Sequence, residues 1–302
     1  MISLTPSVTV IILNWNGYDD TYECIESLQR ITYKNCEILL IDNGSDTENI
    51  LKLENKFEKI KIIRSKENLG YSGGNNIGIN YALQQNADFI LLLNNDTIVE
   101  PDFLNYLISE MLENTSVGIT VPKINYYKNP ELVWYAGGYI SKIRGSGFTI
   151  GEGDLSKNHI KNKYVTFATG CCLLIKSDVI KDIHLLDENY FLYLEDVDYC
   201  MRCSLAGYKI LFVARSKIYH KVSISSKKQN YLLPLYYVTR NRFYFVKKFN
   251  PRLFYLSFPI ISLIFLVKCG FWILNGELEK IKVVKFSIKD FILKRMGKST
   301  EL

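Results

Sequence analysis

The chain of 302 residues lacks the cysteine pattern and the leader sequence that are typical of secreted proteins. Its seven cysteines are odd in number and scattered, whereas secreted disulfide scaffolds carry regularly spaced pairs. The single CxxC, Cys200 and Cys203, has no second pair at zinc-site spacing, so we expect both to be packing residues. The first residues carry no basic segment and the apolar run after them is short, so no secretory signal is expected. These absences favour a reducing, cytoplasmic compartment.

Two common nucleotide-binding signatures are also missing. The first apolar run is followed by Asn14-Trp15-Asn16-Gly17 instead of the glycine turn of dinucleotide-binding proteins, and no GxxxxGK[ST] phosphate loop occurs. The composition, with 48% hydrophobic and 23% charged residues, excludes disorder or a coiled coil for the chain as a whole. The chain is therefore a folded protein that uses neither of these loops.

Short apolar runs alternate with amphipathic segments over the first 121 residues. The runs predict buried strands at 8–13, 37–41, 60–63, 89–93 and 117–121. The segments between them predict helices at 18–30, 47–58 and 76–85, and Pro101 is expected to open a fourth. This alternation indicates βαβ units, a mostly parallel sheet and helices on both of its faces.

Four successive strands of this predicted sheet end in short polar side chains and glycines. The segments are Asn14-Trp15-Asn16-Gly17, Asp42-Asn43-Gly44-Ser45-Asp46, residues 68–76 and Asn94-Asn95-Asp96. Any one of them is compatible with an ordinary turn. In open α/β sheets, however, ligands bind beyond the carboxyl ends of the strands. Four such ends in succession predict a site that hydrogen-bonds a base, a ribose and phosphates.

Asp96 and His220 are candidate ligands for a hard cation. Asp96 directly follows a strongly apolar strand, where a carboxylate is costly unless it is paired or binds a cation. Mg²⁺ and Mn²⁺ favour one or two carboxylates together with substrate phosphates. His220 follows another predicted strand, 208–213, and is a candidate second ligand. An Asx turn or helix cap at Asp96, and an ordinary core or surface histidine at 220, remain the structural alternatives.

Three carboxylates, Glu195, Asp196 and Asp198, fall within four residues and precede Arg202. A helix that begins near Glu195 would pair Asp198 with Arg202 at i,i+4. The positive end of the helix dipole would keep another acid ionised, and an ionised carboxylate in a cleft can act as a general base. A solvated acidic first turn is the alternative.

The C-terminal part of the chain is basic and partly apolar. Residues 217–302 carry 17 Lys and Arg against 4 Asp and Glu, whereas residues 1–216 carry 20 against 27. The apolar stretch Leu253 to Leu274 is broken by Pro259 and Lys268. This pattern favours association with a membrane surface, in the plane of the interface or re-entrant rather than spanning. A buried helix pair with a solvated basic face is the alternative.

Taken in order, these motifs resemble those of the family 2 inverting glycosyltransferases, which have the GT-A fold. Later segments continue the resemblance, namely 170–175, 191–202, 207–210 and Tyr236-Tyr237 with Arg240-Asn241-Arg242. The likeness covers residues 8 to about 248. Within the family, the chain resembles the bacterial rhamnosyltransferase-like enzymes of polysaccharide assembly.

The resemblance implies a role for each matching residue. The residues expected to hold the base and ribose are Asn14, Trp15, Asn16, Asp42, Asn43 and Ser45. Those expected to line the nucleotide-sugar site are Asn68, Gly74 and Asn75. Asn94-Asn95-Asp96 stands in the place of the DxD motif with Asn in its first position, which leaves Asp96 as the main carboxylate. His220 matches the later metal-binding histidine, and Asp196 matches the catalytic base.

The resemblance also implies an architecture and a reaction. We expect an α/β GT-A domain over residues 1–225, with a mixed, mostly parallel sheet, and a basic, apolar helical extension over residues 226–302. Asp196, with Glu195 beside it, would deprotonate the hydroxyl of a polyprenyl-diphosphate-linked glycan at the cytoplasmic face of the membrane. That oxygen would attack dTDP-rhamnose or a UDP-hexose with inversion, aided by Mg²⁺ or Mn²⁺.

Three other functions stay open at this point. One is a nucleotidyltransferase on a related fold, and another is a non-catalytic protein that binds a nucleotide-sugar. A nucleic-acid binder is disfavoured by the acidic first two-thirds of the chain.

Overall fold

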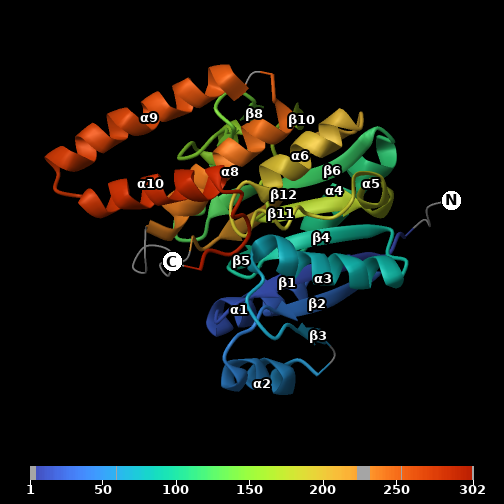
Figure 1. The fold of residues 1–302 in the computed structure, drawn as a ribbon. Coiled ribbons are helices and arrows are strands. Elements are labelled where there is room, and N and C mark those ends of the chain that lie inside the picture. Colours follow the sequence, from blue (N-terminus) through green and yellow to red (C-terminus); the bar gives the residue numbers. More distant parts are fainter. Residues whose placement is uncertain (1–4, 59, 223–231, 253, 301–302) are drawn as a thin grey trace.

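The computed structural model describes residues 5–58, 60–222, 232–252 and 254–300. Within these residues a ten-stranded sheet has the order β10-β12-β6-β11-β4-β1-β2-β3, with β5 paired to β12 and β7 to β6. Three C-terminal helices, α8 to α10, lie together at one side of the sheet and its flanking helices (Figure 1). This is the mixed α/β architecture that the sequence predicts.

The first four long strands are parallel and lie where the apolar runs predict them. They are β1 (Val8–Asn14), β2 (Cys36–Asp42), β3 (Lys61–Arg64) and β4 (Phe89–Asn94). Successive residues of a strand point to opposite faces of a sheet, so the continuous burial of β1 means that both faces are covered. Asn14 is in register with Asp42, and Leu13 with Asn94. Three of the predicted polar strand ends therefore meet at one edge of the sheet.

The second half of the chain adds antiparallel strands. Strand β11 (Cys172–Lys176) runs antiparallel to β4 and to β6 (Val117–Tyr126), which is five residues longer than predicted. Strand β12 (Lys209–His220) runs parallel to β6, and β5 (Thr97–Val99) pairs with its last residues. The remaining strands are β7 (Val133–Tyr135), β10 (Lys163–Val165) and the hairpin of β8 (Gly138–Ser141) with β9 (Ser146–Thr149).

Two of the predicted helices begin and end within two residues of the expected positions. These are α1 (Tyr18–Leu28) and α2 (Thr47–Lys56). Helices α4 (Phe103–Glu113) and α6 (Glu195–Leu205) begin within two residues of the predicted starts. Helix α5 (Ser177–Ile183) and a short 3₁₀ turn at Ser156–Asn158 were not predicted. Pro101 lies in the turn before α4 instead of opening the helix. Cys200 and Cys203 are buried in α6, which confirms them as packing residues.

Helix α3 (Gly70–Gln84) corrects one prediction, because it begins six residues before the expected Asn76. Its glycines let the helix pack closely on β1: a Cβ at Gly74 would lie 2.4 Å from Leu13 Cδ1, and one at Gly78 would lie 2.7 Å from Ile11 Cγ2. A polar, glycine-rich segment such as residues 70–75 predicts a loop. Here the close contact with the sheet stabilises this segment as a helix.

The C-terminal extension is helical, as predicted, and packs on the rest of the protein. It contains α8 (Leu232–Phe249), α9 (Phe254–Leu274) and α10 (Leu278–Ile292). Phe191 stacks on Tyr237 of α8 with ring centroids 5.4 Å apart. The predicted domain boundary at 225 lies outside the described residues. In the described part of the chain one helix segment, Ser257–Leu274, is long and apolar enough to cross a membrane, by length and composition alone.

Candidate active site

The carboxyl ends of β1 and β2 are joined by hydrogen bonds around Ser45. The Ser45 hydroxyl accepts hydrogen bonds from Asn14 Nδ2 at 3.2 Å and from the backbone N–H of Asn16 at 2.9 Å. The Ser45 N–H donates to Asp42 Oδ1 at 3.2 Å. The indole of Trp15 is 57% exposed beside this cluster. The structure thus brings together five of the residues predicted to hold a base and ribose.

Asn43 connects this cluster to the start of α3. Its Nδ2 donates to Asn68 Oδ1 and to the carbonyl of Gly70, both at 3.0 Å, and its Oδ1 accepts from the N–H of Leu69 at 3.0 Å. Gly70 has φ +73°, and a Cβ there would lie 2.1 Å from the carbonyl oxygen of Phe191. The Asn43 side chain therefore shapes a turn that only glycine can complete.

Gly74 and Asn75, predicted to line the nucleotide-sugar site, lie inside α3. Asn75 is buried, and its Nδ2 donates to the carbonyl of Tyr71 one turn earlier at 2.9 Å. Gly74 provides the close contact with β1. In this structure both residues have packing roles, and their contact with a nucleotide-sugar stays a prediction.

The start of α3 is hydrogen-bonded to the segment that leads to the acidic pair. The Tyr71 N–H donates to the carbonyl of Phe191 at 2.8 Å, and the Ser72 hydroxyl donates to that of Tyr190 at 2.7 Å. The Tyr71 hydroxyl donates to the carbonyl of Gly170 at 2.6 Å. Segments about 100 residues apart in sequence are therefore held together at one place.

Glu195 and Asp196 form the first turn of α6. Asp196 Oδ2 accepts from the N–H of Gly170 at 3.0 Å, and its Oδ1 accepts from the N–H of Val197 at 2.8 Å. Glu195 is buried, and its Oε2 has no hydrogen-bond partner among the described residues.

Burial raises the pKa of both acidic groups, and the neighbouring Asp196 carboxylate raises the pKa of Glu195 further. The backbone N–H groups at Asp196 oppose this effect. The sequence-based expectation that the helix dipole keeps an acid ionised is thus incomplete, because desolvation acts in the opposite direction.

The predicted ion pair between Asp198 and Arg202 is confirmed. Arg202 Nε lies 2.7 Å from Asp198 Oδ1, and Lys248 of α8 lies 2.6 Å from Oδ2. Asp198 is fully buried, with both oxygens paired. These two cations balance the charge of the buried carboxylate.

Asp96 and His220 meet, although 124 residues separate them. Strand pairing sets His220 opposite Thr97, and His220 Nε2 lies 3.1 Å from Asp96 Oδ1. The ring of Trp134 packs edge-on against the imidazole with centroids 4.4 Å apart. The imidazole Nδ1 is buried with no partner among the described residues, so Nε2 is the atom that faces the carboxylate.

This pair fits a divalent cation that a substrate helps to bind. A carboxylate oxygen and an imidazole nitrogen are both suitable ligands, and their separation lets one ion contact both. Within the described ranges, no group of three or more His, Cys, Asp and Glu residues could hold a metal. The other ligands must therefore come from backbone, amide, water or substrate oxygens, and diphosphate oxygens suit Mg²⁺ and Mn²⁺.

The acidic pair and the Asp96–His220 pair are joined through two residues of the chain. The Asn94 N–H donates to the carbonyl of Cys171 at 2.9 Å, and the N–H of the adjacent Gly170 donates to Asp196. Asn95, predicted for nucleotide-sugar binding, donates through Nδ2 to Thr21 Oγ1 at 2.9 Å. The predicted base and metal ligands thus lie on either side of one short segment.

Sequence reasoning assigned no role to Asn241 of α8. Asn241 is fully buried, and its Nδ2 donates to the carbonyls of Leu192 and Tyr193 at 3.0 and 2.8 Å. Tyr193 and Leu194 have φ of +67° and +70°, directly before Glu195. The Arg240-Asn241-Arg242 motif was the available signal, but its spacing alone does not reveal this contact.

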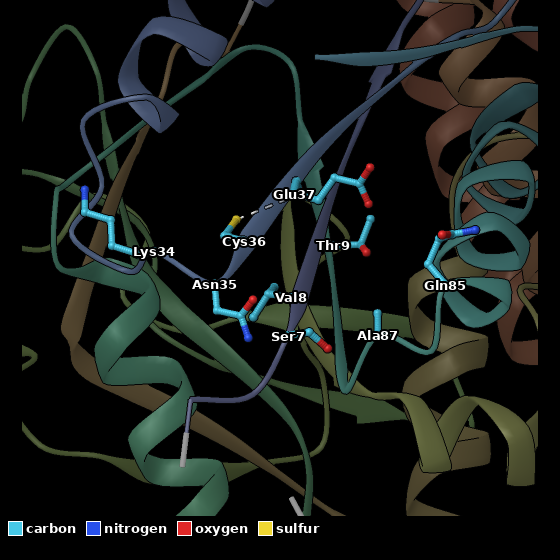
Figure 2. Close-up of a pocket in the computed structure, with 9 residues that line it drawn as sticks. All are labelled: Ser7, Val8, Thr9, Lys34, Asn35, Cys36, Glu37, Gln85 and Ala87. Atoms are coloured by element: carbon cyan, nitrogen blue, oxygen red, sulfur yellow. Dashed lines mark hydrogen bonds between the residues drawn. The ribbon is translucent and has the colours of Figure 1, made fainter. Parts of the chain in front are cut away.

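A cavity of about 240 Å³ opens at the opposite, amino-terminal ends of β1 and β2 (Figure 2). Ser7, Asn35, Cys36 and Glu37 are among its lining residues. Burial and the nearby Glu37 carboxylate raise the pKa of the Cys36 thiol to about 12, which makes it a poor nucleophile. This cavity is separate from the polar strand ends.

The fold is the GT-A fold of glycosyltransferases. The structure of GalNAc-T7 with UDP, GalNAc and Mn²⁺ superposes with a TM-score of 0.61 and 18% identity, over 72% of this chain and 44% of that one. The chain thus spans less than half the length of that structure. The mannosyltransferase PcManGT from Pyrobaculum calidifontis, with GDP-Man and Mn²⁺, superposes with a TM-score of 0.58 and 11% identity, over 95% of this chain and 74% of that one.

The sequence pattern of the family described as glycosyl transferase family 2 matches residues 9–184, and the chain belongs to this family. The low-salt glycan biosynthesis hexosyltransferase Agl10 of Haloferax volcanii is 25% identical over 80% of this chain and 76% of its own length. The dTDP-rhamnosyl transferase RfbF of Shigella flexneri is 24% identical over 76% of this chain and 78% of its own length.

Proposed function

We propose that the protein transfers a sugar from a nucleotide-diphospho-sugar to a hydroxyl of a glycan acceptor, with inversion at the anomeric carbon. The observation that carries the proposal is the link between Asp196 and Asn94, two residues before Asp96, through Gly170 and Cys171. A general base and a group able to face a diphosphate lie beside one short segment at the polar edge of the sheet. The names of the two relatives support dTDP-rhamnose or a hexose nucleotide as the donor.

Asp196 is the better base of the acidic pair. Two backbone N–H groups fix its carboxylate and favour its ionised form. Glu195 has no such partners at Oε2, so one proton shared by the pair resides on Glu195. Asp196 accepts the proton of the acceptor hydroxyl while that oxygen bonds to the anomeric carbon. The bond from that carbon to the diphosphate breaks, and its electron pair leaves with the diphosphate.

Asp96 and His220 would hold a divalent cation, Mg²⁺ or Mn²⁺. When bound, such an ion neutralises the negative charge that develops on the departing diphosphate. Both structural neighbours were solved with Mn²⁺, which supports this choice of group. The cluster around Ser45 would orient the nucleotide, with the exposed Trp15 ring available to stack on the base.

The acceptor that we propose is a glycan linked to a polyprenyl diphosphate carrier at the inner face of the cell membrane. The basic, apolar C-terminal helices support this proposal, as does the glycan biosynthesis in the name of the Haloferax volcanii relative. The protein would then be cytoplasmic and peripheral to the membrane.

A donor screen tests the proposal. The purified full chain with Mg²⁺ or Mn²⁺ is offered dTDP-rhamnose and several UDP-hexoses, with and without a lipid-linked acceptor fraction, and nucleotide release is measured. We expect acceptor-dependent release from one donor, its loss in Asp196→Asn, and its retention in Asp178→Asn, whose carboxylate on α5 is 86% exposed. Unchanged release in Asp196→Asn would remove this residue from the base role. Nucleotide binding without release from any donor would favour a non-catalytic protein.

A further inference from the structure

Helix α9 presents a continuous apolar surface to the outside of the protein. Its most exposed large side chains are Tyr255, Leu263, Leu266, Val267, Phe271 and Leu274, which are 61–86% exposed. Spacings of three, four, seven and eight residues place them on one side of the helix. No charged residue of α9 other than Lys268 interrupts the apolar sequence. Soluble proteins rarely leave such a surface uncovered.

The opposite side of α9 is fixed to the protein by aromatic packing. Phe243 of α8 packs against Phe258 and Phe265 of α9, with ring centroids 5.3 and 6.5 Å apart. Phe254 at the start of α9 packs against Phe291 of α10 at 6.0 Å. The exposed side is therefore a defined surface that projects from the protein (Figure 1).

The path of the chain after α9 argues against a simple membrane span. A short turn leads into α10, which runs back toward α8 (Figure 1). Helix α10 carries Lys282, Lys285 and Lys289, all exposed. If α9 crossed the bilayer in this arrangement, these lysines would be drawn toward the hydrocarbon, where charged side chains are costly. An orientation in the plane of the interface keeps them in water.

The charge around this surface selects its partner. The exposed charges close to α9 and at its end include Arg252, Lys268 and the three lysines of α10, whereas Glu277, Glu279 and Asp290 are the acidic residues of described positions 232–300. An apolar face bordered by an excess of lysine and arginine matches acyl chains bordered by anionic headgroups. A second copy of this chain would place basic surfaces against each other.

We propose that the exposed face of α9 lies in the plane of an anionic membrane, inserted just below the headgroups, with the lysines of α10 beside the lipid phosphates. This surface stands independently of which sugar is transferred.

Flotation with vesicles tests the surface. The full chain is mixed with vesicles of phosphatidylcholine alone, or with 30% phosphatidylglycerol (about one anionic lipid in three, enough for a strong surface potential). We expect flotation with the anionic vesicles, weakened by salt. The triple variant Leu263→Gln, Leu266→Gln, Val267→Gln should lower the bound fraction about tenfold. The matched control Leu51→Gln, Ile160→Gln, Leu205→Gln replaces other exposed apolar side chains and should float normally.

Two further measurements separate the rival arrangements. On bound protein, an impermeant thiol reagent should label Thr300→Cys, whose position is exposed, above the background of the native cysteines. Protection of Thr300→Cys would indicate a span and overturn the in-plane arrangement. Failure of the wild-type chain to float, or normal flotation of the α9 variant, would overturn the membrane surface. A wild-type dimer that the α9 variant converts to a monomer, without vesicle binding, would assign the face to a second copy.

Discussion

Asn241 is placed to hold in shape the loop of residues 192–194, which directly precedes Glu195 and the proposed base Asp196, so its removal should impair turnover more than donor binding. Its Nδ2 hydrogen-bonds the carbonyls of Leu192 and Tyr193, and no other described side chain donates to either of them. Tyr193 and Leu194 are both left-handed, at φ +67° and +70°. This conformation costs about 1–2 kcal/mol for each residue other than glycine. Without the two hydrogen bonds the loop can relax, and Glu195 and Asp196 would move with it.

The structure sets the size of both effects. Asn241→Ala leaves two partly buried carbonyls without their partner, at about 1–3 kcal/mol each at most, and the released backbone strain offsets part of that loss. We expect a net loss of roughly 2–3 kcal/mol, which is a fall of about 4 °C in Tm for a chain of this length. Misplacement of a base by about 1 Å can lower kcat by about 100-fold. The donor KM should change little, because the proposed nucleotide contacts are on β1 and β2.

Paired variants decide whether Asn241 acts through the loop. Thr239→Val on the same turn of α8 removes a buried hydroxyl that bonds only to Leu235 of that helix, at 2.6 Å, so it should leave kcat unchanged. Asn241→Asp keeps the shape but replaces the donor by an acceptor, so it should lose kcat as Asn241→Ala does. A variant that melts earlier yet retains full kcat would refute the positioning role. An equal loss of kcat in Thr239→Val would also refute it.

Three further predictions follow from the site. Burial raises the pKa of Glu195, so the folded state binds its proton more tightly than the unfolded chain does, and the stability of the fold falls as pH rises through that pKa. The Tm of Glu195→Gln relative to wild type should therefore increase between pH 5 and pH 8. A constant Tm difference would contradict a buried, titrating acid. Gly70→Ala adds a Cβ 2.1 Å from the carbonyl oxygen of Phe191, so it should lower both Tm and turnover, whereas an alanine at Gly207, where nothing lies within 4 Å, strains only the backbone. Asp96→Asn should weaken Mn²⁺ binding about 10-fold or more in the presence of nucleoside diphosphate, measured by calorimetry, while Asp178→Asn should not; equal affinities would remove Asp96 from the proposed metal site.

Local pattern was sufficient for the parallel part of the sheet. Apolar runs of five or six residues located β1, β2 and β4, and the polar residues after them met at one edge because parallel strands end on the same side. The contact between Asp96 and His220 could not be derived in this way. The contact depends on the pairing of β5 with β12, which the local sequence does not predict. The family resemblance indicated that the two residues act together.

Tertiary packing decided what the sequence pattern left out. In the sequence alone, the glycines of α3 predict a loop. In the folded protein they let α3 pack closely on β1, and the segment is helical. The raised pKa of Glu195 and Asp196 is caused by burial in the folded protein, whereas only the adjacent carboxylates and the helix dipole are visible in the sequence. The sequence pattern therefore located the acidic residues but did not show that burial raises their pKa.

Helix α8 links the proposed membrane surface to the loop of residues 192–194. On one side Phe243 packs against α9, and on the other Asn241 and the fully buried Arg240 face the loop and the end of the chain. Arg240 donates to the carbonyl of Arg295 at 3.3 Å and to that of Asn189 at 3.5 Å. Because the same 18-residue helix makes all of these contacts, the C-terminal helices cannot be a detachable anchor. Their removal would expose the loop that orients Asp196, and the loss of activity would extend to soluble acceptors as well as to those in a membrane.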